Sequence, residues 1–245
     1  MIAGFLTPDQ GNIIWQGQDL AGTSPADRPL SMIFQDDNFT LGDVVDDMCG
    51  LSEAYRKLGR LKTAEIRVGG NPAEKIGGWD YMAPFSPGDV IAEYTRPARV
   101  VRKGVVVTLP ALTERHSIGV DGRGTMEAFL TDGLRSVMSS IPAEEMSEYT
   151  VRWPGHIERF IRERDSNSLD LEKLIGEWRF DIETPEFTWM EVMVEGDGRT
   201  RWILDDEGGV QGSSMARTTG AITCATVEHL LETDVPVGVH PPEAL

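Results

Sequence analysis

The sequence predicts a mixed α/β (α+β) fold, because strand-like and helix-like segments intermingle along the whole chain. Alternating apolar and polar residues around a glycine-containing turn predict a β-hairpin at 187–206, and two valine-rich arms around Arg-Lys-Gly predict another at 100–109. Apolar residues at helical spacing predict helices at about 87–94 and 157–164. They also predict a longer helix over 213–232, with a break at its Thr-Thr-Gly.

The other elements follow in chain order. A helix is expected over about 42–61, and the alternating run at 64–68 predicts a strand. The glycine pair at 69–70 is expected to end that strand in a turn. A serine followed by a proline suits the start of the helix at 87–94.

The middle of the chain continues the alternation. Strands are expected at 117–120 and 149–152, on either side of a glycine-rich segment. Helical segments are expected at 126–129 and 133–140, and Pro-Gly precedes the helix at 157–164.

The composition is strongly acidic. The chain has 23 Lys and Arg against 40 Asp and Glu, which gives a net charge of -17. Such a surface repels phosphate backbones and anionic lipid heads, so neither nucleic acid nor membrane is an expected partner. No apolar run approaches the ~18 residues that cross a bilayer, and we expect a soluble, cytoplasmic protein.

Metal and nucleotide motifs are missing from the sequence. Cys49 and Cys224 lie far apart, and the four histidines form no HxxxH or HExxH pair, so no metal site is expected. There is no GxGxxG after a strand and no GxxxxGK[ST]. No phosphate-binding loop is therefore predicted from motifs.

Two segments carry candidate anion-binding residues. In the first, Thr131 or Asp132 would cap a helix, or the helix start together with Arg135 would hold a substrate carboxylate. In the second, Arg152 and His156 would bind a carboxylate and carry a proton near neutral pH. The alternative for the second segment is a surface turn with a partly buried histidine.

Two more segments leave similar alternatives. Tyr94 and Arg96 close the short helix at 87–94, where the tyrosine is either a core aromatic or an acid. The helix start at 213–220 has small residues that would approach a cofactor or allow tight helix packing. From the residues alone, the chain is an α/β domain that binds a small anion.

Six runs, in order, resemble the saccharopine dehydrogenase, saccharopine reductase and lysine 6-dehydrogenase family. The longest are FSPGDVIAEYTRPARVV at 85–101 and GTMEAFLTDGLR at 124–135. The others are RVGG at 67–70, RWPGH at 152–156, SSMARTTG at 213–220 and GVHPPEAL at 238–245. The resemblance covers about 45–245 and is specific, because such long matches in one order do not arise by chance.

The resemblance implies a mixed-sheet substrate-binding and dimerisation domain over 45–212, with a helix and tail at 213–245 that return to a Rossmann domain. It implies hydride transfer between NAD or NADP and the C–N bond of an amino acid, and a homodimer. The implied catalytic residue is His156. The implied substrate-binding residues are Tyr94, Arg96, Thr131, Asp132, Arg135 and Arg152, and the implied cofactor-binding residues are Ser213, Arg217 and Thr218.

The chain departs from that family at its start. The Rossmann fingerprint is absent, and residues 1–40 resemble a fragment of an ABC transporter ATPase of the thiamine-importer type, with Gln35 at the Q-loop position. We therefore expect a truncated or chimeric chain, with a junction near 38–45, a poorly ordered start and no activity alone. The alternatives are a non-catalytic amino-acid-binding or dimerisation module, and an ATP-binding transporter fragment.

Overall fold

The chain divides into two units, residues 1–36 and 37–245, and each is described by itself. The computed structural model describes residues 14–15, 18–19, 55–209 and 212–234. In the first unit, β1 (Ile14–Trp15) pairs antiparallel with β2 (Gln18–Asp19). The predicted poor order of residues 1–40 and the predicted junction lie largely outside the described residues.

The second unit is built on an eight-stranded mixed sheet. Its strands are β3 (Leu61–Pro72), β4 (Ala98–Arg102), β5 (Val105–Leu109), β6 (His116–Val120), β7 (Gly124–Leu130), β8 (Ala143–Arg152), β9 (Glu186–Glu195) and β10 (Arg199–Glu207). The main order is β10-β9-β3-β8-β4-β5, and β7 joins β6 to β8. β3 and β8 run parallel, whereas the other pairs are antiparallel.

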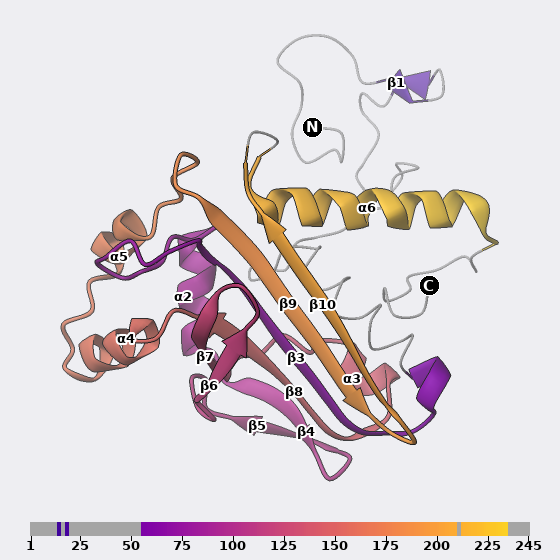
Figure 1. Cartoon of the computed structure of the whole chain (residues 1–245). Helices are drawn as coiled ribbons and strands as arrows, with labels where there is room; N and C mark the ends of the chain where they lie inside the picture. The colour runs from indigo at the N-terminus through magenta and orange to yellow at the C-terminus, as the bar shows by residue number, and fades with distance from the viewer. Residues whose placement is uncertain (1–13, 16–17, 20–54, 210–211, 235–245) are drawn as a thin grey trace. The chain divides into compact units, whose positions relative to one another are not determined.

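Strand β8 is central, because β3 lies along one of its edges while β4 and β7 share the other (Figure 1). Its side chains alternate between two packed faces. Met146 belongs to a core formed mainly by β3, β8, β9 and the short helix near 137–140, whereas Tyr149 and Val151 belong to a second core formed with β4, β6 and β7. A strand buried on both faces can place polar side chains deep inside the domain.

The helices are α2 (Pro87–Thr95), α3 (Val137–Ser140), α4 (His156–Asp165), α5 (Leu171–Glu177) and α6 (Ser214–Glu232). Figure 1 shows α2, α4 and α5 gathered at one end of the sheet. They enclose a third core that includes Tyr94, Phe129, Phe160 and Trp178. Helix α6 contacts β9 and β10. Among the described helices, none is long and apolar enough to cross a bilayer.

The two predicted hairpins and the helices predicted at 87–94 and 157–164 are confirmed. The hairpin at 100–109 is β4 and β5, and the one at 187–206 is β9 and β10. Helices α2 and α4 begin and end within a few residues of their predicted limits. These elements depend on local patterns, so the sequence was sufficient to place them.

The predicted helix at 126–129 is wrong, since this run is part of strand β7. Met126, Ala128 and Leu130 alternate onto the core shared with β4 and β6, while Phe129 points into the helical core. Because both faces are buried, Phe129 is apolar like Met126, Ala128 and Leu130, and the two-residue period is unclear apart from Glu127. Residues 126–129 form a strand because both of their faces pack against the rest of the domain.

The predicted turn at 69–70 is also wrong, because β3 continues through both glycines to Pro72. A Cβ atom on Gly69 would lie 2.2 Å from the carbonyl oxygen of Val151, and one on Gly70 would lie 2.9 Å from Pro84. These glycines serve close approach of neighbouring backbone and side chains. Such a role cannot be distinguished from a turn in the sequence alone.

Three helix limits need correction. The helix expected at 133–140 is reduced to Val137–Ser140, and the break expected within 213–232 does not occur in α6. Of the helix expected at 42–61, residues 42–54 lie outside the described ranges, residues 55–58 are helical, and Leu61 already belongs to β3. The predicted limits failed where glycines lay within or beside a helix, since tertiary contacts override local propensity there.

Candidate functional site

Arg152, Tyr94 and His156 form a buried polar network. Arg152 is the last residue of β8, His156 begins α4, and Tyr94 lies near the end of α2. Nε of Arg152 donates to the Tyr94 hydroxyl at 2.9 Å, and that hydroxyl lies 3.1 Å from Nε2 of His156. All three side chains are buried. The sequence predicted these residues, and the fold brings them together from three elements.

The second ring nitrogen of His156 fixes the tautomer. Nδ1 lies 3.0 Å from the carbonyl oxygen of Trp79, which can only accept a hydrogen bond, so Nδ1 carries the proton and Nε2 accepts from Tyr94. Burial, and then the positive charge of Arg152, lower the pKa of His156 to about 3. The imidazole is therefore neutral near pH 7, and the expected role of His156 in proton transfer stays a prediction.

Aromatic rings surround the network. Trp178 lies with its ring centroid 5.3 Å from that of His156, and Tyr81 lies 4.9 Å from the same imidazole. The guanidinium carbon of Arg152 is 4.5 Å from the centre of the Tyr81 ring. An arginine stacked on aromatic faces in a desolvated setting is held by cation–π attraction as well as by hydrogen bonds.

Burial is the main cause that raises the pKa of Tyr94, which stays a neutral phenol.

Asp132 organises a second polar group at the end of β7. Its carboxylate accepts hydrogen bonds from the Arg99 side chain at 3.0 Å and lies 3.2 Å from Nε of Arg96. Despite the opposing effect of burial, the hydrogen bonds from Arg99 lower the pKa of Asp132. The expectation that Asp132 caps a helix is wrong, because α3 begins only at Val137.

Thr131 likewise caps no helix, since its hydroxyl oxygen lies 2.6 Å from a carboxyl oxygen of Glu148 and 2.8 Å from the Thr150 hydroxyl. Thr150 in turn donates to Glu93 at 2.5 Å. Sequence reasoning did not predict roles for Glu93, Glu148 or Thr150. One signal was available: Glu148, Thr150 and Arg152 alternate along β8, although this pattern is usual for a solvent-facing strand.

Arg135 lies apart from the helix start predicted for it. Its backbone has a φ of 45°, and it precedes α3 by two residues. The carboxylate site predicted from a helix N-terminus at this position is therefore not formed by backbone amides of a helix. The role of Arg135 in substrate binding stays a prediction.

The predicted cofactor residues lie at the start of α6 and are engaged within the chain. The Ser213 hydroxyl accepts from the amide of Ala216, and Thr218 donates to the backbone oxygen of Ser214 at 3.0 Å. The Arg217 guanidinium contacts both carboxylate oxygens of Asp206 at 2.6 Å.

Dinucleotide phosphates do not fit this helix start. The amide of Ser214, which would face a phosphate, donates to the carboxylate of Glu186 at 2.5 Å. Glu186 and Asp206 place acidic groups beside the helix end, and like charge repels a diphosphate. The adjoining cavity, which Ser213 lines, has a volume of about 150 Å³, smaller than the ~300 Å³ at which ligand pockets begin.

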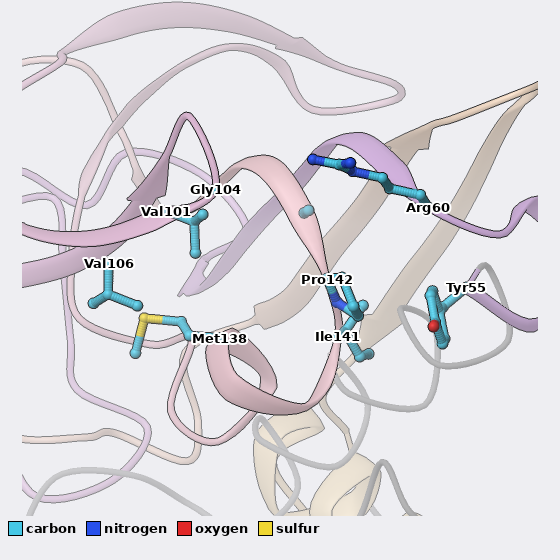
Figure 2. Close-up of a pocket in the computed structure, with 9 residues that line it drawn as sticks. Tyr55, Arg60, Val101, Gly104, Val106, Met138, Ile141 and Pro142 are labelled. Atoms are coloured by element: carbon cyan, nitrogen blue, oxygen red, sulfur yellow. The ribbon is translucent and has the colours of Figure 1, made fainter.

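A separate groove of about 380 Å³ lies beside β4 and α3. Figure 2 shows Val106 and Met138 along it, with Tyr55 and Arg60 at one side. None of the predicted site residues lines this groove. Within the described ranges, no group of three or more His, Cys, Asp or Glu side chains is placed to hold a metal ion.

A family model described as the saccharopine dehydrogenase C-terminal domain matches residues 36–245. The chain belongs to the saccharopine dehydrogenase C-terminal domain family. This confirms the resemblance noted in the sequence, and the eight-stranded mixed sheet of this saccharopine dehydrogenase C-terminal domain confirms the predicted fold class.

Two solved structures share the fold of this saccharopine dehydrogenase C-terminal domain. Apo saccharopine dehydrogenase (L-Glu forming) from Saccharomyces cerevisiae has a TM-score of 0.58 and 16% identity, over 82% of this chain and 66% of that one. Homospermidine synthase from Legionella pneumophila, in complex with NAD, has a TM-score of 0.52 and 11% identity, over 87% and 52%. At these identities the likeness concerns the fold alone, and the chain spans less than two thirds of either protein.

Short segments also match thiamine import ATP-binding proteins. The Cereibacter sphaeroides protein ThiQ is 54% identical over 37 residues, 15% of this chain and 16% of that protein. The Photobacterium profundum protein ThiQ is 53% identical over 83 residues, 34% and 33%. These matches agree with the transporter resemblance noted in the sequence. The chain spans about a sixth and a third of these relatives, which is too little to assign it to their family.

Proposed function

We propose that this chain provides the amino-acid-binding domain of an NAD- or NADP-dependent oxidoreductase that acts on the C–N bond of an amino acid. Membership of the saccharopine dehydrogenase C-terminal domain family supports the reaction class. The observation that carries the binding role is the buried Arg152 guanidinium. Among the described residues, no carboxylate oxygen lies within 4.0 Å of it.

A buried guanidinium without an adjacent carboxylate favours an anionic ligand. Arg152 donates three hydrogen bonds to described oxygens, those of Tyr94, Val151 and Tyr81, whereas a guanidinium has five N–H donors. Glu93 favours the charge of Arg152 from beyond ion-pair contact, but it takes none of the guanidinium hydrogen bonds, and a carboxylate matches the planar fork of arginine. A substrate carboxylate would supply a directly contacting negative charge and the missing acceptors.

The position of Arg152 agrees with this role. It ends β8, which pairs in parallel with β3, and ligands of α/β proteins bind outside the carboxyl ends of parallel strands. Tyr94 is held between Arg152 and the neutral His156, so its hydroxyl has a fixed direction. We assign His156 the role of accepting the hydrogen bond that the Tyr94 hydroxyl donates. Arg96, Thr131, Asp132 and Arg135 are kept as proposed substrate contacts.

Family membership is the support for proposing NAD or NADP as the cofactor. The homospermidine synthase that shares the fold binds NAD. The start of α6, with Ser213, Arg217 and Thr218, does not suit dinucleotide phosphates. No step of hydride transfer is therefore assigned to the described residues. We place the protein in the cytoplasm, in line with its acidic composition.

Thermal-shift and calorimetric titrations with glutamate, lysine and saccharopine test the binding role. We expect at least one of these amino acids to stabilise the chain, and Arg152→Lys to weaken its binding by about tenfold or more because lysine lacks the bidentate fork. Arg162→Lys, an exposed arginine of α4, is the matched control and is expected to bind like the original chain. Absence of any shift at millimolar ligand would overturn the proposal.

The second candidate is an amino-acid-binding or dimerisation module without catalysis. The acidic start of α6 favours it, because the Ser214 amide and the Ser213 hydroxyl are engaged within the chain and Glu186 and Asp206 repel phosphate. Fluorescence titration with NADH and NADPH separates the two. Micromolar binding of either cofactor supports the oxidoreductase, whereas amino-acid binding without cofactor binding supports the module.

A further inference from the structure

Two buried carboxyl groups are joined through two threonine hydroxyls. Glu93 accepts from Thr150 at 2.5 Å, the Thr150 and Thr131 hydroxyl oxygens lie 2.8 Å apart, and Thr131 contacts Glu148 at 2.6 Å. Glu93 lies on α2, Thr150 and Glu148 lie on β8, and Thr131 follows β7. Each of the four side chains is at most 5% exposed.

Counting hydrogens shows that this row needs one more proton than its hydroxyls supply. It contains three oxygen–oxygen contacts, but Thr131 and Thr150 carry one hydroxyl hydrogen each. If Glu93 and Glu148 were both ionised, both hydroxyls would donate outward, and the 2.8 Å contact between them would hold no hydrogen. One proton on either carboxyl group completes the row in a single direction.

The surrounding charges decide where that proton rests. Burial is the largest cause that raises the pKa of Glu93, but Arg152 and Arg96 favour its ionised form. For Glu148, burial and then the negative charges of Glu93 and Asp132 raise the pKa to about 8, and the Gly133 amide and Thr131 oppose this only in part. The carboxylate therefore belongs on Glu93 and the proton on Glu148.

We propose that Glu93, Thr150, Thr131 and Glu148 form a buried relay that holds one shared proton and moves it between the two carboxyl groups. In one direction, Glu148 gives its proton to the Thr131 oxygen as Thr131 gives its own to Thr150 and Thr150 gives its own to Glu93. Glu148 becomes the carboxylate and Glu93 the acid, with no change in net charge. The negative charge that Arg152 attracts thereby moves from Glu93 to Glu148. This inference does not depend on the proposed function.

The relay has a measurable consequence for unfolding. The folded pKa of Glu148 lies above the unfolded value of ~4.3, so its contribution to stability is fully present below that value and is lost as pH rises to about 8. Within this window, unfolding releases the shared proton. The unfolding constant therefore gains up to about tenfold per pH unit from this one group.

Urea unfolding of the full chain between pH 5.5 and about pH 8.5 tests the relay by comparing two glutamines on β8. In Glu148→Gln the amide donates to Thr131 as the acid would, but it has no proton to release. We expect its log unfolding constant to have a slope against pH that is lower by about one than that of the original chain. Glu144→Gln changes an exposed glutamate of the same strand and is expected to keep the original slope.

Infrared spectra of the folded original chain provide a second readout that needs no variant. We expect the C=O stretch of a protonated carboxyl group near neutral pH, and its loss as pH is raised through about 8 while circular dichroism stays unchanged. If Glu148→Gln fails to fold, this titration decides alone. Equal slopes for all three chains, or no protonated carboxyl band near neutral pH, would overturn the proposal.

Discussion

The Tyr94 hydroxyl lies 3.1 Å from Nε2 of His156, although the two residues are 62 positions apart in the chain. Because Nδ1 of the same ring faces the Trp79 carbonyl, the hydroxyl donates to the imidazole and accepts from Arg152. One phenol thus fixes both a neutral histidine and a buried arginine. The end of α2 is thereby linked to the start of α4 and to the end of β8.

Tyr94→Phe removes this shared partner. We expect it to lower the free energy of unfolding by about 1–3 kcal/mol, since Nε of Arg152 and Nε2 of His156 lose a buried hydrogen-bond partner. Urea unfolding at pH 7 measures the loss. Tyr55→Phe removes a hydroxyl from an exposed tyrosine and should change stability by less than about 0.5 kcal/mol. Equal effects of the two substitutions would contradict the network.

His156 makes stability depend on pH in acid. Its folded pKa of about 3 lies below the unfolded value of ~6.5, so its contribution is present above pH ~6.5 and is lost as pH falls towards 3. We expect the free energy of unfolding to fall by up to about 1.4 kcal/mol for each pH unit in this range. His156→Asn should lose this part of the pH dependence. The exposed His229→Asn is the control for chemical denaturation between pH 4.5 and about pH 7. Parallel curves for His156→Asn and the original chain would refute this assignment.

Two glycine substitutions should act in opposite directions. A Cβ on Gly133 would lie 2.7 Å from the Glu148 side chain, so Gly133→Ala should destabilise the chain by about 1–3 kcal/mol. Gly220 lies within α6 with nothing within 4 Å of its added Cβ. Gly220→Ala should therefore stabilise by about 0.5–1 kcal/mol through helix propensity. Melting temperatures provide the comparison, and a stabilising Gly133→Ala would show that Glu148 is not confined.

Dimerisation through the β9–β10 hairpin stays a prediction. In the described part of the chain β10 pairs only with β9, and its Ile203 is 45% exposed. An edge strand with an exposed apolar side chain invites pairing with a second copy. We expect a dimer in sedimentation velocity at tens of micromolar and its weakening by Ile203→Lys. Glu172→Lys on α5 introduces the same side chain elsewhere and should leave the dimer intact, whereas a monomeric original chain would refute the prediction.

The sequence by itself determined the mixed class, the β4–β5 and β9–β10 hairpins and helices α2 and α4, because each depends on contacts between near neighbours. It also singled out Arg152, Tyr94 and His156 as candidate residues. Only the tertiary structure decided that 126–129 is a strand, since packing of apolar side chains on both faces obscures the two-residue period.

The tertiary structure likewise decided how the polar side chains meet. Thr131 and Glu148 are 17 residues apart and Thr150 and Glu93 are 57 apart, yet both pairs are in hydrogen-bond contact. In the sequence these residues resemble the exposed half of a strand and a helix end. Their role depends on burial and on nearby charge, because the same carboxyl group is ionised in water but holds a proton when it is enclosed beside another acid.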